Sequence, residues 1–156
     1  MRTSFLSTVV LALGVLPAAA QQDVCVRQGT GQIDQQATAR WREMANAADP
    51  RVMQALSGVW YSETRAPTGQ VAYTYFTYEP NGLYQYSQRV CGGMNMCSDF
   101  AGHGLFAARS AGGNGFVGMT IVSDLQRDRL CTGLNGRFID AQTFQSADGA
   151  YARKVR

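Results

Sequence analysis

Histidine is almost absent from this chain, since His103 is the only one. A single imidazole, with no second histidine and no suitable carboxylate pattern, gives little basis for acid–base catalysis. The chain also lacks a Gly-x-Ser-x-Gly elbow and a Ser-x-x-Lys motif, so it offers no recognisable serine nucleophile. From these absences we predict that the protein is not an enzyme and uses no cofactor.

Charge is also sparse. Charged residues make up 16% of the chain, with 14 lysines and arginines against 11 acidic residues. The arginines are scattered and form no dense basic run with interleaved aromatic residues, which argues against a nucleic-acid-binding protein.

The longest apolar run lies at the N-terminus and is interrupted by a glycine and a proline. Residues 1–20 combine a basic start at Arg2, an apolar stretch over Phe5–Leu16 and a run of alanines, the order typical of a secretory signal peptide. A membrane anchor is the alternative, but the run is shorter than the roughly 20 residues that a span needs. We therefore expect a periplasmic or secreted protein whose mature chain starts at Gln21 and has no membrane span.

Four cysteines follow this segment, which indicates two disulfide bonds in an oxidising compartment. Three pairings are possible. Cys91 and Cys97 lie close together across a glycine-containing turn, which leaves Cys25 to pair with Cys131 and to tie the N-terminal arm to the rest of the chain.

The exported part divides into an arm, a helical segment and a β domain. Residues 21–32 are polar and aperiodic, as expected of an extended arm. Residues 33–56 predict an amphipathic helix, with Trp41 docking it on the core, and then a short helix that starts at Asp49-Pro50. Residues 57–156 form the β domain.

Within that domain, turn dipeptides separate pieces of strand length. Eight strands joined by tight turns indicate an antiparallel sheet, and closing such a sheet removes its two edges. We predict a mainly β fold, an eight-stranded up-and-down barrel preceded by one or two helices, with a two-layer sandwich as the alternative. The expected strands are Val59–Thr64, Gln70–Tyr78, Leu83–Val90, Ser98–Ala108, Phe116–Ser123, Asp128–Leu134, Arg137–Gln145 and Ala150–Val155.

Gly58 and Trp60 open this β domain, and Arg153 lies near its end. In this the chain resembles the lipocalin and calycin superfamily, whose first strand carries Gly-x-Trp and whose last strand carries an arginine that stacks on the tryptophan. The resemblance implies that Arg153 covers Trp60 at one end of the barrel. It also implies a binding protein for a small apolar or amphipathic molecule.

Aromatic residues are dense on the expected strands. They either line a binding pocket or pack a filled core, and the sequence does not decide which face of Val71–Tyr78 points inward. The candidate ligand-binding residues are Tyr73, Tyr75, Tyr84, Tyr86, Phe100 and Phe106.

Two other functions remain open. Met94 and Met96 are soft ligands for Cu(I), and His103 could add a third, although methionines in a turn can also simply cover a barrel end. The chain also resembles small bacterial inhibitors of metalloproteases, which have a similar barrel, a Gly-x-Trp start and a free N-terminal arm. That resemblance implies that residues 21–32 would enter a protease cleft.

Overall fold

The computed structural model describes residues 23–93, 96–124 and 127–156, apart from the side chains of residues 124, 127 and 128. The predicted signal peptide lies outside these residues. Two helices, α1 (Gln35–Asn46) and α2 (Pro50–Leu56), precede the strands. The strands are β1 (Gly58–Arg65), β2 (Val71–Tyr78), β3 (Leu83–Cys91), β4 (Cys97–Gly112), β5 (Gly115–Asp124), β6 (Arg127–Asp140), β7 (Thr143–Ser146) and β8 (Tyr151–Lys154).

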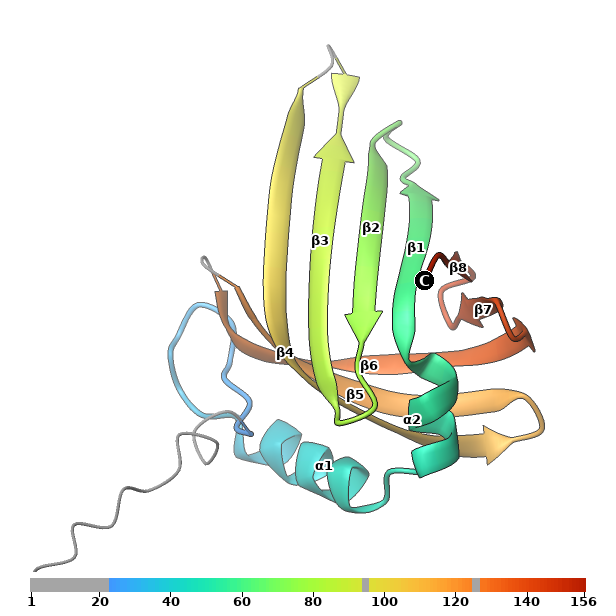
Figure 1. The fold of residues 1–156 in the computed structure, drawn as a ribbon. Helices are drawn as coiled ribbons and strands as arrows, with labels where there is room; N and C mark the ends of the chain where they lie inside the picture. The colour runs from blue at the N-terminus through green and yellow to red at the C-terminus, as the bar shows by residue number, and fades with distance from the viewer. Residues whose placement is uncertain (1–22, 94–95, 125–126) are drawn as a thin grey trace, which may run out of the picture.

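The strands form a closed antiparallel barrel in sequence order, from β1 to β8. The predicted up-and-down barrel is therefore confirmed. Closure depends on a short ladder in which Trp60, Tyr61 and Ser62 of β1 pair with β8. In Figure 1, the axes of the antiparallel strands β1, β2 and β3 are nearly aligned, while β5 and β6 run across below them. The sheet is therefore strongly coiled.

The turn predicted between the expected strands Asp128–Leu134 and Arg137–Gln145 is wrong. Asn135-Gly136 lies inside β6, and the chain turns between Asp140 and Thr143 instead. Gly136 is required by packing, because a Cβ there would lie 2.5 Å from the carbonyl oxygen of Gln145 and 2.9 Å from Cζ of Phe116. The dipeptide that suggests a hairpin therefore marks a close approach between neighbouring strands.

Each helix begins after a capping aspartate, and the start of α2 at Asp49-Pro50 is as predicted. The Asp34 carboxylate accepts a hydrogen bond of 2.9 Å from the Ala37 amide at the start of α1, and Asp49 caps α2 with Pro50 at its first turn. Trp41 of α1 is 4% exposed and packs with Ala107 and Ile121 against the outside of the barrel. Neither helix is long and apolar enough to cross a membrane, within the part of the chain that the structure describes.

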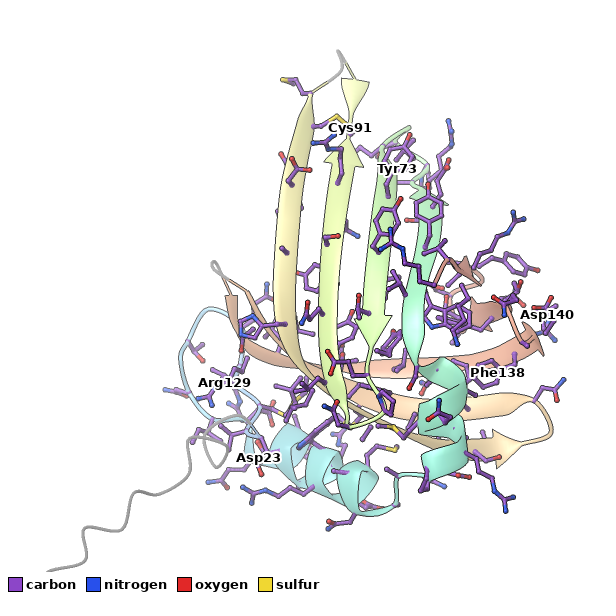
Figure 2. All side chains as sticks on the ribbon, viewed as in Figure 1. Asp23, Tyr73, Cys91, Arg129, Phe138 and Asp140 are labelled. Carbon is purple, nitrogen blue, oxygen red and sulfur yellow. A yellow bond between two sulfur atoms is a disulfide. The ribbon has the colours of Figure 1, made fainter. Side chains whose placement is uncertain are left out.

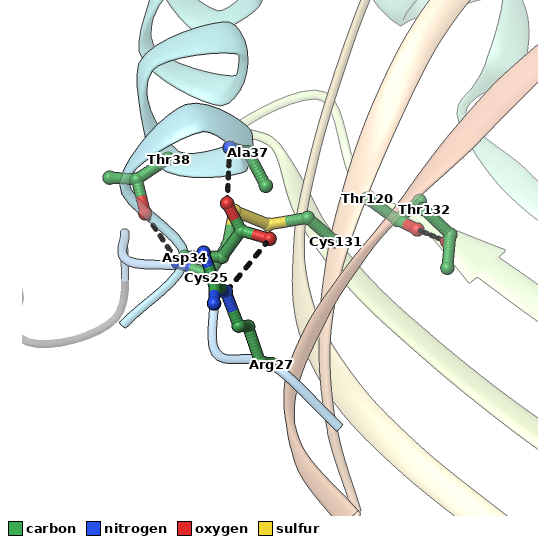
Figure 3. Close-up of a disulfide and its surroundings, with 8 residues drawn as sticks. All are labelled: Cys25, Arg27, Asp34, Ala37, Thr38, Thr120, Cys131 and Thr132. Carbon is green, nitrogen blue, oxygen red and sulfur yellow. Dashed lines mark hydrogen bonds and ion pairs between the residues drawn. A yellow bond between two sulfur atoms is a disulfide. The ribbon is translucent and has the colours of Figure 1, made fainter. Parts of the chain in front are cut away.

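The two disulfides pair as predicted, Cys25 with Cys131 and Cys91 with Cys97. The first joins the N-terminal arm to β6, and the buried Cys25 amide also donates a hydrogen bond of 3.0 Å to Oγ1 of Thr38 (Figure 3). Two disulfides indicate a compartment more oxidising than the cytoplasm.

The residue that covers Trp60 differs from the prediction. Lys154 places Nζ 5.2 Å from the centroid of the indole ring, whereas Arg153 pairs with Tyr61 on the opposite face of the strand. A one-residue difference reverses the face because side chains alternate along a strand. Gly58 has a φ of 127°, and a Cβ there would meet Lys154 and lie 2.6 Å from the Arg156 carbonyl oxygen. A cation therefore covers Trp60 as predicted, but the cation is Lys154 and not Arg153.

Replacing Lys154 with methionine should lower the free energy of unfolding by about 1 kcal/mol, because the cation–π contact with Trp60 is lost while most of the packing remains. The matched control is Arg153→Met, which should stay within about 0.5 kcal/mol of the wild type. Urea unfolding followed by tryptophan fluorescence measures both. The reverse order of the two effects would show that Arg153 is the residue that covers the ring.

Candidate functional site

The inner face of the barrel has two halves, and the half next to α2 is filled. Trp60 is fully buried, and its ring centroid lies 4.8 Å from that of Phe144 in an edge-on contact. The rings of Tyr78 and Phe106 meet at 4.9 Å in the same way. This core also contains Met53, Leu56, Tyr84, Ala108, Phe116 and Ala152.

Burial changes the chemistry of two of these residues. It raises the pKa of Tyr78 well above its ordinary value, with a smaller contribution from the nearby Tyr84. Burial likewise raises the pKa of Tyr84, with Tyr86 adding to the effect. Both phenols stay protonated near neutral pH, so they act there as packing groups with a neutral hydroxyl.

The other half of the inner face is accessible to solvent. Phe76 and Tyr86 lie in register with Trp60, so their side chains also point into the barrel. The next inward-facing row across the strands consists of Ser62, Thr74, Gln88 and Phe100. Four of these inward side chains are partly exposed. We call the following set the mouth surface: Thr74, Phe76, Tyr86, Gln88 and Phe100.

The mouth surface carries ordered polar groups beside its rings. Gln88 donates a hydrogen bond of 2.9 Å to Oγ1 of Thr74, and Thr74 is 5% exposed. Across the barrel, the hydroxyls of Thr120 and Thr132 lie 2.8 Å apart (Figure 3). Thr132 is exposed although it shares the inward face with the buried Thr120. Apolar rings and amide or hydroxyl groups therefore lie on the same inward face of the barrel.

A close approach between strands shapes the floor beneath the mouth surface. At Gly102, a Cβ would clash with Cε1 of Tyr86 and would lie 3.0 Å from Cγ1 of Val122. The absence of a side chain at Gly102 lets Tyr86 of β3 and Val122 of β5 close over β4. Tyr86 and Val122 both pack against the filled core, so the floor of the open half is continuous with that core.

The six predicted ligand-binding residues fall into three groups. Tyr86 and Phe100 lie on the mouth surface, whereas Tyr84 and Phe106 are only 6% and 2% exposed and belong to the filled core. Tyr73 and Tyr75 point out of the barrel, so their predicted place in its interior is wrong. Tyr75 is 47% exposed, and its ring packs on that of Tyr61 at 5.1 Å. Tyr73 lies near the end of β2 that follows the turn from β1 (Figure 2).

Sequence reasoning missed Phe76, Thr74 and Gln88. The available signal was register: the tight turn between the first two strands places Phe76 opposite Trp60, which the sequence already suggested was buried. Aromatic residues occupy both faces of β2, so alternation alone could not identify the inward face.

The predicted copper ligands do not come together among the described residues. Met94 lies outside them, while Met96 is 67% exposed at the hairpin tip beside the oxidised pair Cys91 and Cys97. His103 lies within β4, opposite Gln85 of β3. Seven residues of extended chain from Met96 correspond to about 23 Å, too far for His103 to share a metal ion with Met96.

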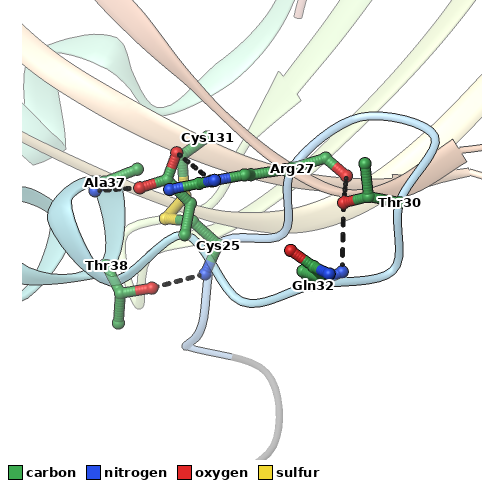
Figure 4. Close-up of polar contacts among 8 residues, drawn as sticks. Cys25, Arg27, Thr30, Gln32, Ala37, Thr38 and Cys131 are labelled. Atoms are coloured by element: carbon green, nitrogen blue, oxygen red, sulfur yellow. Dashed lines mark hydrogen bonds and ion pairs between the residues drawn. A yellow bond between two sulfur atoms is a disulfide. The ribbon is translucent and has the colours of Figure 1, made fainter.

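The N-terminal arm is tied down. Besides the disulfide of Cys25, the Val26 amide donates to the Arg129 carbonyl oxygen at 2.7 Å, and Val26 forms a β-bridge with Ile33. Arg27 lies 3.9 Å from the Asp34 carboxylate, and the Thr30 hydroxyl accepts from the Gln32 amide (Figure 4). From Cys25 onward, this arm lacks the freedom that insertion into a protease cleft requires.

A hollow of 530 Å³ separates the two helices from the turn between β2 and β3. Its lining is mainly apolar and includes Trp41 and Ala45 of α1, Met53 of α2 and Leu105 of β4. Met53 and Trp41 also belong to the two buried clusters, so this groove is the seam where the helices meet the barrel.

A scan of protein-family models and searches of curated proteins and solved structures each found no significant match for this chain. The closed eight-stranded barrel is consistent with a lipocalin-like fold. These comparisons assign no family to the chain.

Proposed function

We propose that this chain is a periplasmic or secreted binding protein that holds a small amphipathic molecule at the mouth surface and performs no catalysis. The observation that carries this proposal is the partial exposure of inward-facing Phe76, Tyr86 and Phe100 above a filled core. Exposed rings on the inside of a closed barrel are available to an apolar ligand without any rearrangement of the core.

The polar groups favour an amphipathic ligand over a purely apolar one. Gln88 and Thr74 lie in the row next to Phe76 and Tyr86, so a ligand stacked on the rings would bring a polar group within reach of an amide or hydroxyl. Such groups fix orientation in otherwise apolar sites. Thr132 offers a further hydroxyl from β6.

A non-catalytic role is supported by the titratable groups near the site. The buried phenols of Tyr78 and Tyr84 have raised pKa values and remain neutral. The single imidazole, His103, occupies the outer face and does not meet the mouth surface. Two oxidised cysteine pairs support export, because such bonds persist in oxidising compartments.

A fluorescent fatty acid and retinol test the proposal. Phe100→Ser and Tyr86→Ala should each weaken binding by about tenfold, the loss expected when an aromatic contact worth about 1.4 kcal/mol is removed. Tyr75→Ser is the matched control, because it removes a partly exposed ring from the outer face of the same sheet. Thermal unfolding of each variant checks that the barrel is intact.

Equal affinity in all three variants would place any ligand elsewhere. If neither probe binds, the proposal that the mouth surface holds an amphipathic ligand would be rejected. Tyr84 is unsuitable for this test, because its burial would turn the substitution into a loss of core packing.

A further inference from the structure

A cavity of 240 Å³ lies on the outside of the barrel, on the opposite face from the mouth surface. Strand register lines up Gln85 of β3, His103 of β4 and Ser123 of β5 as neighbours, and Arg129 of β6 completes the polar lining. The side chains of this row alternate with those of the inward row, so Gln85, His103 and Ser123 point away from the barrel interior. Tyr84 and Gly104, which belong to the inward row, also border the cavity.

The polar lining consists of hydrogen-bond donors. Arg129 contributes a guanidinium with donors in a fixed fork, His103 an imidazole, Gln85 an amide and Ser123 a hydroxyl. No aspartate or glutamate is among the described residues that line the cavity. Leu83 and Ile121 supply an apolar edge, and Leu83 is 40% exposed.

The guanidinium of Arg129 forms no ion pair with the described side chains. Among the described side chains, ion pairs are formed by Arg27, Arg65 and Arg89, and none involves Arg129 or His103. The backbone of Arg129 is held by the Val26 amide, and Cys131 two residues later carries the disulfide to the arm. The strand position that presents the guanidinium is therefore well supported.

We propose that this outer cavity binds a small organic carboxylate with a short apolar chain. The guanidinium of Arg129 matches the planar geometry of a carboxylate, and Gln85 and His103 can donate to the same group. The apolar part of the ligand would lie against Leu83 and Ile121. A volume of 240 Å³ suits a molecule of a few carbon atoms, below the usual size of drug-like ligands.

The single histidine makes the test direct, because its Cε1 proton gives one assignable NMR signal. Sodium butyrate should shift this signal saturably, since the bound carboxylate would lie beside the imidazole ring. Arg129→Leu should weaken butyrate binding by about tenfold or more. Arg109→Leu, an exposed arginine of β4 outside the cavity, is the matched control and should leave the affinity unchanged.

An equal shift with sodium chloride at matched ionic strength, or unchanged affinity in Arg129→Leu, would overturn the proposal. Tighter binding of inorganic phosphate than of butyrate would overturn the carboxylate assignment. If Arg129→Leu does not fold, backbone amide mapping of the wild type decides: butyrate should shift the amides of Gln85, His103 and Ser123. Butyrate-induced shifts confined to the mouth surface would contradict the outer site. The butyrate test does not depend on whether fatty acids bind at the mouth surface.

Discussion

Replacing Cys25 and Cys131 together with alanine is expected to lower the free energy of unfolding by about 5 kcal/mol. This disulfide spans 106 residues, and a cross-link that closes a long loop removes much conformational entropy from the unfolded chain. The native state also loses a contact, because the buried Cys25 holds the arm against Trp41 and Ile121. Guanidinium unfolding followed by circular dichroism measures the loss.

The second disulfide provides the control. Cys91 and Cys97 are separated by only 6 residues, so the same entropic argument predicts a loss of about 2 kcal/mol when both are replaced with alanine. The difference between the two double variants tests whether loop length governs the stabilisation. A loss that is equal in both, or larger for the short loop, would contradict it.

Trp60→Ala is expected to cost about 3–5 kcal/mol, the range for removing a large buried ring. Three contacts disappear at once: the edge-on packing on Phe144, the contact with Lys154 and a hydrogen bond of 2.6 Å from the indole Nε1 to the Leu56 carbonyl oxygen. The last of these links the end of α2 to the start of the barrel. Hydrogen exchange should therefore become faster along the β1 and β8 ladder as well as in α2.

The Trp41→Ala variant tests whether the effect of Trp60→Ala comes from the role of Trp60 in closing the barrel or from the loss of any buried tryptophan. Trp41 is nearly as buried as Trp60, but it lies between α1 and the outside of the sheet. Its loss should release α1 and leave the β1 and β8 amides protected. Equal exchange patterns in the two variants, or a loss below about 1 kcal/mol for Trp60→Ala, would contradict a special role for Trp60 in closing the barrel.

The barrel and the helices before it could be predicted because each depends on local chemistry repeated along the chain. Asp49-Pro50 starts a helix through capping and a preset φ, and glycine-containing turns such as Asn81-Gly82 join neighbouring strands. Cysteine spacing was sufficient to pair Cys91 with Cys97, which left one partner for Cys25. Closure then followed from the need of a long antiparallel meander to remove its edges.

The site depended on information that local patterns do not carry. Tyr75 and Phe76 are neighbours of similar chemistry, and only pairing with Trp60 decides that Phe76 points inward. Lys154 and Arg153 are both cations in the last strand, and a register difference of one residue decides which covers the indole. Asn135-Gly136 resembles a turn, yet the ring of Phe116 on the adjacent strand makes it a packing position.

The sequence by itself therefore determined the number of strands, their order and their covalent links, but not the boundary between β6 and β7. Tertiary structure alone decided which face of each strand points inward and which half of the barrel stays open. The physical reason is that a strand's two faces are equivalent until it pairs, and a shift of one residue exchanges them. A filled core beside α2 and exposed rings at the other end result from that pairing.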